Sequence, residues 1–211
     1  MKRKDRRIQV LDCARRIFGR KGYHSTSVSD IIREAGIARG TFYLYFDSKR
    51  AIFDELLDEL FVRIDECINR VDPSVGPGDV IGQLIDNVER VFALLSSDRD
   101  MTRIVLHEAV GLDQGFDRKL EEFYRKILDT IEVSLNLGIE MNLVRNLDVR
   151  IVALAILGAI KEVLYRQPEW LADAKARRTA SEEMLRLFLS GLAEQELFSG
   201  MPEVSDTLLT S

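Results

Sequence analysis

The stretch SVSDIIREAGIARGTFYLYFDSKRAIF, residues 27–53, decides the fold of the N-terminal part of this chain. Its pattern predicts a helix, a tight turn, a second helix and the start of a third. Ser27 stands three residues before Asp30, the spacing of a capping box at a helix start. Apolar residues then recur three and four apart, and Gly36 stands where a left-handed residue would end that helix.

The second helix of this stretch, expected over residues 38–46, has one apolar side that we expect to face inward, formed by Ala38, Phe42 and Phe46. Its other sides carry arginine, glycine, hydroxyl and aromatic groups. Two short helices that meet in this way are typical of a helix-turn-helix that reads the major groove of DNA. The residues themselves therefore predict a DNA-binding protein.

The same region resembles the N-terminal domain of the TetR family of bacterial transcriptional regulators. The segments that carry the resemblance are Gly22-Tyr23, Thr26-Ser27, Ala35-Gly36-Ile37, Arg39-Gly40-Thr41-Phe42-Tyr43 and Phe46-Asp47-Ser48-Lys49. By motif it covers roughly the first fifty-five residues, and beyond them the likeness is one of architecture. It implies an all-α fold of three N-terminal and six C-terminal helices.

A set of residues in and around the helix-turn-helix is predicted to contact DNA: Thr26, Ser27, Arg39, Gly40, Thr41, Tyr43, Leu44, Tyr45 and Lys49. Arg39 can donate two hydrogen bonds to the O6 and N7 edge of a guanine. Gly40 lets the backbone approach the duplex, and Lys49 adds a charge at a helix start that would meet a phosphate. The resemblance implies that matching positions touch the operator. The alternative is that these are ordinary polar surface residues.

The charge distribution supports a nucleic-acid partner for one end of the chain. The net charge of the whole chain is −5, which alone argues against such a partner. Residues 1–50, however, hold thirteen Lys and Arg against five Asp and Glu, a net of +8, and the remainder carries −13. A basic head on an acidic body fits a phosphate-facing N-terminal domain. The basic residues before position 8 either reach a minor groove or form a solvated tail.

The composition predicts a cytoplasmic globular protein. The 211 residues are 46% hydrophobic and 31% charged. Two cysteines and no secretory signal are typical of a reducing compartment. The longest apolar run, IVALAILGAI over residues 151–160, is too short to span a bilayer, so we expect no membrane contact.

Helical periodicity continues to the C-terminal part of the chain. We expect Asp47 or Ser48 to cap a fourth helix, Asp148 an eighth and Ser181 a ninth. The break DPSVGPGD at 72–79 separates the fourth helix from the fifth. The predicted organisation is a DNA-binding domain over residues 1–48, a ligand-binding and dimerisation domain over 49–198, and a flexible tail over 199–211.

Nothing in the sequence favours catalysis, a metal site or a cofactor. The two histidines, His24 and His107, are far apart, and no HExxH, CxxC, Walker or GxSxG motif occurs. His107 lies among apolar residues of the sixth helix and is either satisfied at a helix edge or a polar group in an apolar ligand cavity. The candidate cavity wall is Phe92, His107, Phe123, Tyr124 and Ile127, although aromatic residues at this spacing also suit a plain core.

The run at 151–160 is apolar on every side, so it needs cover all round. Small residues three and four apart on this helix permit close approach by another helix. We expect a homodimer interface from the eighth and ninth helices, formed by Ala155, Gly158, Ala159, Phe188 and Leu192. A four-helix dimer interface is also what the family resemblance implies. The alternative is burial within one chain.

These observations predict a homodimeric repressor that binds a palindromic operator in double-stranded DNA and is released by a small apolar effector. The arrangement of residues 80–166 is loosely similar to the fatty-acyl-CoA-responsive FadR-type branch of the family, which implies a fatty acyl-CoA. A rival interpretation is a DNA-binding dimer without a pocket, whose C-terminal domain recruits a protein partner. A cavity in the structure favours the first, and a filled helix bundle favours the second.

Overall fold

The structure is a computed structural model that describes residues 3–108, 114–166 and 169–190. Regular structure in this part of the chain is all helical, which confirms the predicted all-α class. Its α-helices are α1 (Arg3–Lys21), α2 (Val28–Ala35), α3 (Arg39–Tyr43), α4 (Lys49–Cys67), α5 (Pro77–Ser97), α6 (Arg99–Arg103), α7 (Gln114–Glu140), α8 (Val149–Arg166) and α9 (Ala174–Ser190). A π-helical turn, Ile104–Glu108, follows α6, and a 3-10 turn, Glu169–Ala172, precedes α9. Leu192 and the predicted tail lie outside the described residues.

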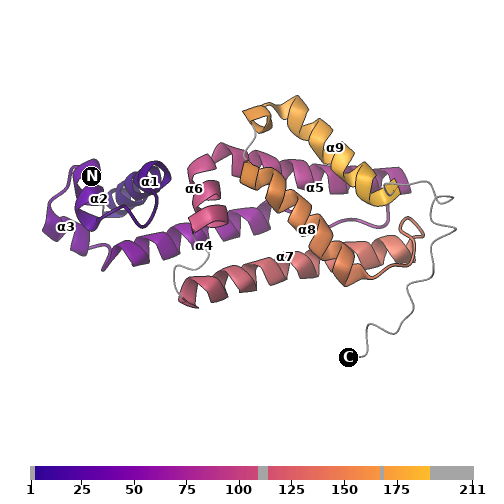
Figure 1. Cartoon of the computed structure of the whole chain (residues 1–211), viewed down its shortest axis with the longest axis horizontal. Coiled ribbons are helices and arrows are strands. Elements are labelled where there is room, and N and C mark those ends of the chain that lie inside the picture. The colour runs from indigo at the N-terminus through magenta and orange to yellow at the C-terminus, as the bar shows by residue number, and fades with distance from the viewer. Residues whose placement is uncertain (1–2, 109–113, 167–168, 191–211) are drawn as a thin grey trace.

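The helices form an elongated molecule with a small head at one end (Figure 1). The head consists of α1, α2 and α3. Helix α4 leaves the head and runs into the body, where α5, α7 and α8 extend along the long axis. Helix α9 packs on α5, and α6 lies between body and head in contact with α1.

The caps predicted at both ends of α2 are present. The Ser27 hydroxyl accepts a hydrogen bond from the Asp30 amide at 3.1 Å, and the Asp30 carboxylate accepts one from the Ser27 amide at 3.0 Å. Hydrogen bonds from Ser27, and then from Lys21, hold the pKa of Asp30 well below its ordinary value. At the other end Gly36 takes φ 61°, and the Ile37 amide donates to the Ile32 carbonyl at 3.2 Å, which closes a Schellman motif.

Two details of the predicted local structure were wrong. Ala38 is the exposed N-cap of α3, and only Phe42 and Phe46 of the expected inward side are buried. Ser181 does not start the ninth helix, because Asp173 caps it eight residues earlier through the Ala176 amide. Ser181 is instead a buried residue inside α9, and its hydroxyl donates to the Arg177 carbonyl at 2.9 Å. The caps expected at Ser48 and Asp148 are confirmed.

The head and the near end of the body share one continuous apolar core. Phe53 of α4 is central to it: its ring centroid lies 5.8 Å from that of Phe18 in α1 and 5.1 Å from that of Phe116 in α7. Buried residues of α6 and the π-helical turn, among them Met101 and Ile104, belong to the same cluster. Apolar packing across the predicted domain boundary at residue 48 therefore fixes the position of the head on the body.

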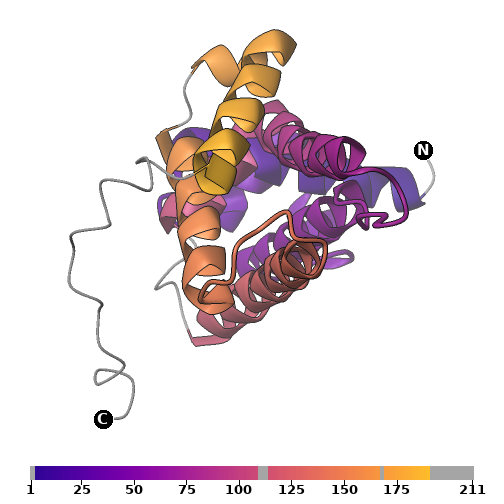
Figure 2. The ribbon, with the colours of Figure 1, turned by 90° about the vertical axis from the view of Figure 1, so that its right-hand side faces the viewer.

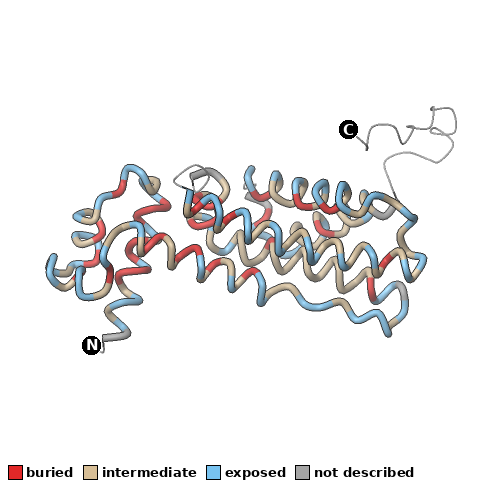
Figure 3. Tube along the Cα trace, turned by 90° about the horizontal axis from the view of Figure 1, so that it is seen from below, coloured by how far each residue is buried: buried red, intermediate tan, exposed pale blue. Residues whose placement is uncertain are grey.

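The far part of the body is packed differently (Figure 3). Fully buried residues concentrate in the head and its junction with the body, whereas residues 81–91 of α5 are all half-buried. Half-burial on every side of a helix is unusual for one that packs on a filled core. It indicates that the inward side of α5 faces open space.

Candidate functional site

The outer surface of α3 is the exposed side of the helix-turn-helix. Leu44 is 68% exposed, and Arg39, Gly40 and Tyr43 are exposed beside it. The guanidinium carbon of Arg39 lies 5.9 Å from the centroid of the Tyr43 ring, and among the described residues Arg39 makes no ion pair. This guanidinium is therefore available to an external acceptor, unlike Arg33, which pairs with Asp30.

Gly40 has no internal reason to be a glycine. A Cβ built on it meets nothing within 4 Å, and its φ is not in the left-handed region. An exposed helical glycine costs roughly 0.5–1 kcal/mol relative to alanine. Its presence on the outer side of α3 fits a surface that another molecule approaches closely.

Three of the residues predicted to contact DNA have roles inside the head. Thr26 is 2% exposed, and its hydroxyl donates to the Gly22 carbonyl at 2.7 Å. Lys49 donates from Nζ to the Tyr23 carbonyl at 2.7 Å and lies 4.1 Å from the centroid of that ring, while burial lowers its pKa. Tyr45 is half-buried against the shared core. Ser27 is exposed at the start of α2, and Thr41 is half-buried.

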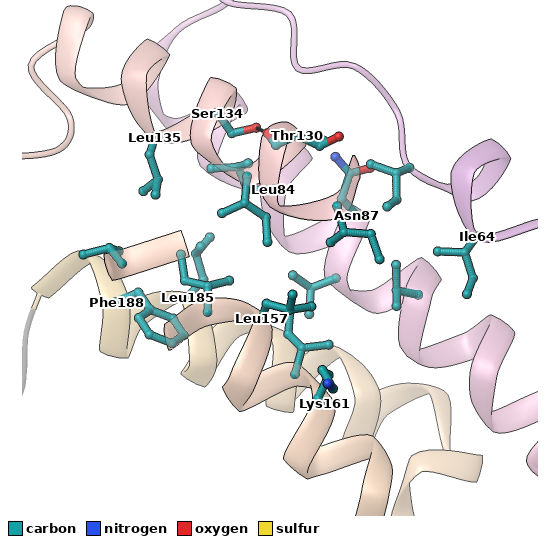
Figure 4. A pocket seen from close by; sticks show the side chains of 18 of the residues that line it. Ile64, Leu84, Asn87, Thr130, Ser134, Leu135, Leu157, Lys161, Leu185 and Phe188 are labelled. Atoms are coloured by element: carbon teal, nitrogen blue, oxygen red, sulfur yellow. Dashed lines mark hydrogen bonds between the residues drawn. The ribbon is translucent and has the colours of Figure 1, made fainter. Parts of the chain in front are cut away.

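The body contains a cavity of about 230 Å³. Seen from the end opposite the head, α5, α7 and α8 are arranged around the long axis (Figure 2). Residues of α4, α5, α7, α8 and α9, together with Thr102 of α6 and Val105 and Leu106 of the π-helical turn, line the cavity. Figure 4 shows side chains from these walls, with Leu84, Leu157 and Phe188 among them. A site that holds a single water needs about 10–15 Å³, so this space is far larger than a packing defect.

The cavity wall is mainly apolar, and the side chains of Asn87, Thr130 and Ser134 in it are already hydrogen-bonded. Thr130 and Ser134 donate to carbonyls of their own helix, Lys126 and Thr130, at 3.0 Å each. The Asn87 amide exchanges two hydrogen bonds of 2.8 Å with the backbone of Asn69. An occupant would therefore gain mainly from burial of hydrocarbon.

The structure brings part of the predicted ligand set together. Phe123, Tyr124 and Ile127 of α7 lie in the cavity wall. Phe92 does not: it is 0% exposed and packs in a second core cluster between α5, α8 and the 3-10 turn. For His107 the structure describes the backbone, within the π-helical turn, and not the side chain. The sequence did not predict the α8 and α9 walls, because the apolar run of α8 indicates either a dimer interface or burial within one chain and not a cavity wall.

The apolar run of α8 has two separate faces. Val152, Ile156 and Ile160 line the cavity. On the opposite side Ile151 is 60% exposed and Leu154 is 52% exposed, and Ala155 and Gly158 are exposed beside them. A Cβ on Gly158 would meet nothing within 4 Å in this chain. Of the other predicted interface residues, Ala159 is half-buried and Phe188 faces the cavity.

Ion pairs connect the near end of the body to the head. Asp98, the N-cap of α6, lies 3.6 Å from Arg15 of α1 and 3.5 Å from Arg63 of α4. Arg15 also pairs with Glu59 of α4 at 3.1 Å. The cavity wall continues directly from α6 into the π-helical turn, and such turns are frequent at functional sites. Helix α6 thus touches both the cavity and the head.

No helix among the described residues is long and apolar enough to cross a membrane.

The N-terminal part of the chain matches a known family. The sequence model described as "Bacterial regulatory proteins, tetR family" matches residues 10–56. That span runs from α1 through the helix-turn-helix into α4.

Relatives and solved structures extend the likeness over the body. A fatty acid metabolism regulator protein of Bacillus subtilis (strain 168) is 28% identical over 189 residues, covering 88% of this chain and 94% of that protein. The crystal structure of a transcriptional regulator FadR from Bacillus subtilis in complex with stearoyl-CoA superposes with a TM-score of 0.67 at 26% identity, covering 88% of this chain and 99% of that one. A TetR-like transcriptional regulator from Rhodococcus sp. RHA1 gives a TM-score of 0.73 at 22% identity, covering 90% and 99%.

The matched head, the nine-helix fold of the described residues and these relatives agree with the resemblance seen in the sequence. Proteins of this kind are DNA-binding regulators rather than enzymes. The N-terminal domain of this chain is a DNA-binding domain of the TetR family, and the whole chain is similar in sequence and fold to transcriptional regulators of that family.

Proposed function

We propose that this protein is a homodimeric repressor that binds a palindromic operator and leaves it when a fatty acyl-CoA or a similar apolar effector occupies the body. The observation that carries the proposal is the apolar cavity, because one of its walls continues into the helix that contacts the head.

The DNA-binding surface of the proposal is the exposed side of α3 with the start of α2. Arg39, Gly40 and Tyr43 would approach base edges, and Ser27 would approach a phosphate. Tyr45 lies at the half-buried edge of this surface. Thr26 and Lys49 would act indirectly, since their hydrogen bonds fix the loop that joins α1 to α2.

The dimer surface of the proposal is the outer side of α8, joined by α9. Exposed apolar residues on α8 recur three and four apart, and Leu187 of α9 is exposed as well. An apolar stripe of this kind on a protein surface is typical of an interaction site. Two heads on one dimer would then match two half-sites of a palindrome.

The effector class rests on two independent points. The cavity wall is mainly apolar, which suits a hydrocarbon chain. A FadR structure similar to this chain was solved with stearoyl-CoA, which is a property of that protein and the reason to test acyl-CoAs here. The rival interpretation, a protein-recruiting body without a pocket, expects a filled bundle and is disfavoured by the cavity.

The proposed switch is a shift between two dimer conformations. An effector that binds only one spacing of the heads draws the population toward that spacing. To change the dimer from almost fully competent for DNA binding to almost fully released, the effector must bind the released form about 10⁴-fold more tightly than the DNA-binding form. Helix α6 lines the cavity through Thr102, and its N-cap Asp98 forms ion pairs with Arg15 and Arg63. These contacts give a physical route for the coupling.

The test starts from binding-site selection with the purified protein and random duplex DNA. The proposal expects a palindromic consensus bound by one dimer, and fluorescence anisotropy should show release by dodecanoyl-CoA or octadecanoyl-CoA. Coenzyme A alone is the matched control and should have no effect. A consensus without symmetry would contradict the dimeric operator, and stable DNA complexes at saturating acyl-CoA would contradict the effector class.

A further inference from the structure

Among the described residues that line the cavity, one side chain is charged. Lys161 of α8 lies among residues that are otherwise apolar, amide or hydroxyl in character. Its Nζ makes no hydrogen bond or ion pair with any described residue. Lys119 of α7, by contrast, pairs with Asp54 at 2.7 Å and Asp58 at 2.8 Å.

The contact that Lys161 does make is with an aromatic ring. Its Nζ lies 4.1 Å from the centroid of Tyr124, which also lines the cavity. A cation–π contact orients an ammonium without neutralising it. Burial raises the pKa of Tyr124, so the phenol keeps its proton and can donate a hydrogen bond beside the ammonium. The pair thus offers donors in an apolar wall and no acceptor carboxylate.

The pair lies toward the head end of the cavity. Tyr124 is in the first half of α7, next to Phe123, whose ring stacks on Phe61 of α4 at 3.9 Å. Helix α8 also contacts α6 and the π-helical turn. Figure 4 shows Lys161 on one side of the cavity and Leu135 and Phe188 on the other. The wall around Leu135 and Phe188 is apolar apart from Ser134, whose hydroxyl donates to the Thr130 carbonyl.

We propose that Lys161, held over Tyr124, binds the anionic head of an amphiphilic effector whose hydrocarbon chain extends toward Leu135 and Phe188. The head group is a carboxylate or a phosphate, since both present oxygens that accept hydrogen bonds from an ammonium. This inference rests on the proposed function, because it assumes that the cavity binds the effector. It adds the orientation of the ligand and the residue that recognises its polar end.

The orientation matters for the switch. A polar head at Lys161 would be held by α8, which contacts α6 and the π-helical turn, and α6 in turn contacts α1 of the DNA-binding head. A plain hydrocarbon would fill the cavity but would not engage Lys161. Lys161 is therefore expected to separate anionic amphiphiles from neutral ones of equal length.

The experiment measures binding of dodecanoate, dodecanoyl-CoA and dodecan-1-ol to the full chain by isothermal titration calorimetry. The variants are Lys161→Met, which removes the charge, and Lys161→Arg, which keeps it. Arg166→Met is the matched control, because Arg166 is on the same helix, is exposed and pairs with Glu162 outside the cavity wall. Circular dichroism melting shows whether each variant is folded.

We expect Lys161→Met to weaken dodecanoate, dodecanoyl-CoA or both by about tenfold or more, the loss of a charged hydrogen bond, while dodecan-1-ol binds as before. Lys161→Arg should retain most of the preference, and Arg166→Met should retain all of it. A loss confined to dodecanoate identifies a carboxylate, and one confined to the CoA ester identifies a phosphate.

Equal affinities of wild type and Lys161→Met for both anionic ligands would overturn the inference and leave the cavity proposal intact, with Lys161 directing its ammonium to water. If Lys161→Met is unfolded, the preference of Lys161→Arg decides, since loss of the preference in that folded variant contradicts recognition by charge. If none of the three ligands binds wild-type protein, the proposed function itself fails and this inference fails with it.

Discussion

Gly19 of α1 lies against Asp100 of α6 so closely that a Cβ on Gly19 would overlap Cβ and Cγ of Asp100. This contact joins the DNA-binding head to the helix that reaches the cavity. A glycine in the interior of a helix is costly, and here the close approach of two helices explains it. This contact gives a movement of α6 a direct path to α1.

Gly19→Ala tests this junction. Because Cβ of Asp100 is part of the overlap, α1 and α6 would have to separate, and we expect a loss of about 1–3 kcal/mol in the free energy of unfolding by urea. Asp100→Ala keeps that Cβ and should not rescue the variant, whereas Asp100→Gly should restore much of the loss. An unchanged unfolding midpoint for Gly19→Ala would show that α6 is free to shift away from α1.

Gly40→Ala separates stability from DNA binding. The added methyl group meets open space within the chain, so the free energy of unfolding should stay equal or rise by up to about 1 kcal/mol. Operator affinity should fall by about tenfold, in the range of one good base contact. Gly78→Ala in the first turn of α5 is the matched control, with open space around it as well. Unaltered operator affinity for Gly40→Ala would show that DNA does not closely approach the backbone of α3 at this residue.

Much of the head could be predicted because its signals are local. Ser27, Asp30 and Gly36 act within a few residues of one another, so their spacing already specifies the helix ends. Serine is a common capping residue, but Ser181 is buried inside α9, where its hydroxyl donates to the Arg177 carbonyl one turn earlier. Its sequence context does not reveal this burial. Phe92 and Lys161 show the same limit in the body, because a helix pattern does not tell whether an inward residue meets a core or a cavity.

Gly158→Leu tests the dimer surface. Gly158 is exposed, and a Cβ built on it has no atom of this chain within 4 Å. A single chain can therefore accommodate the new side chain. Helical circular dichroism and melting of the protomer should therefore be retained, while sedimentation velocity shows a monomer. Gly78→Leu makes the same change at another exposed helical glycine and should leave the dimer intact. A dimeric Gly158→Leu protein would place the interface on another face.

Two substitutions on α5 compare the cavity with the core. Leu84→Phe adds bulk to a residue of the cavity wall, so its melting curve should stay close to wild type while dodecanoyl-CoA binds more weakly. Phe92→Trp adds bulk to a fully buried residue of the second core cluster and should cost about 1–3 kcal/mol. If both substitutions destabilise the protein equally, the space beside Leu84 is filled in solution.

The spacing of the two DNA-binding heads tests the central claim most directly. A nitroxide at Ser25→Cys, an exposed head residue, in a Cys67→Ser background leaves only buried Cys13 as a further thiol. Pulsed electron paramagnetic resonance of the dimer then reports the distance between the two heads. We predict that dodecanoyl-CoA shifts this distance distribution, that coenzyme A alone does not, and that operator DNA shifts it in the opposite direction. An identical distribution with and without bound acyl-CoA would contradict a switch that acts through head spacing.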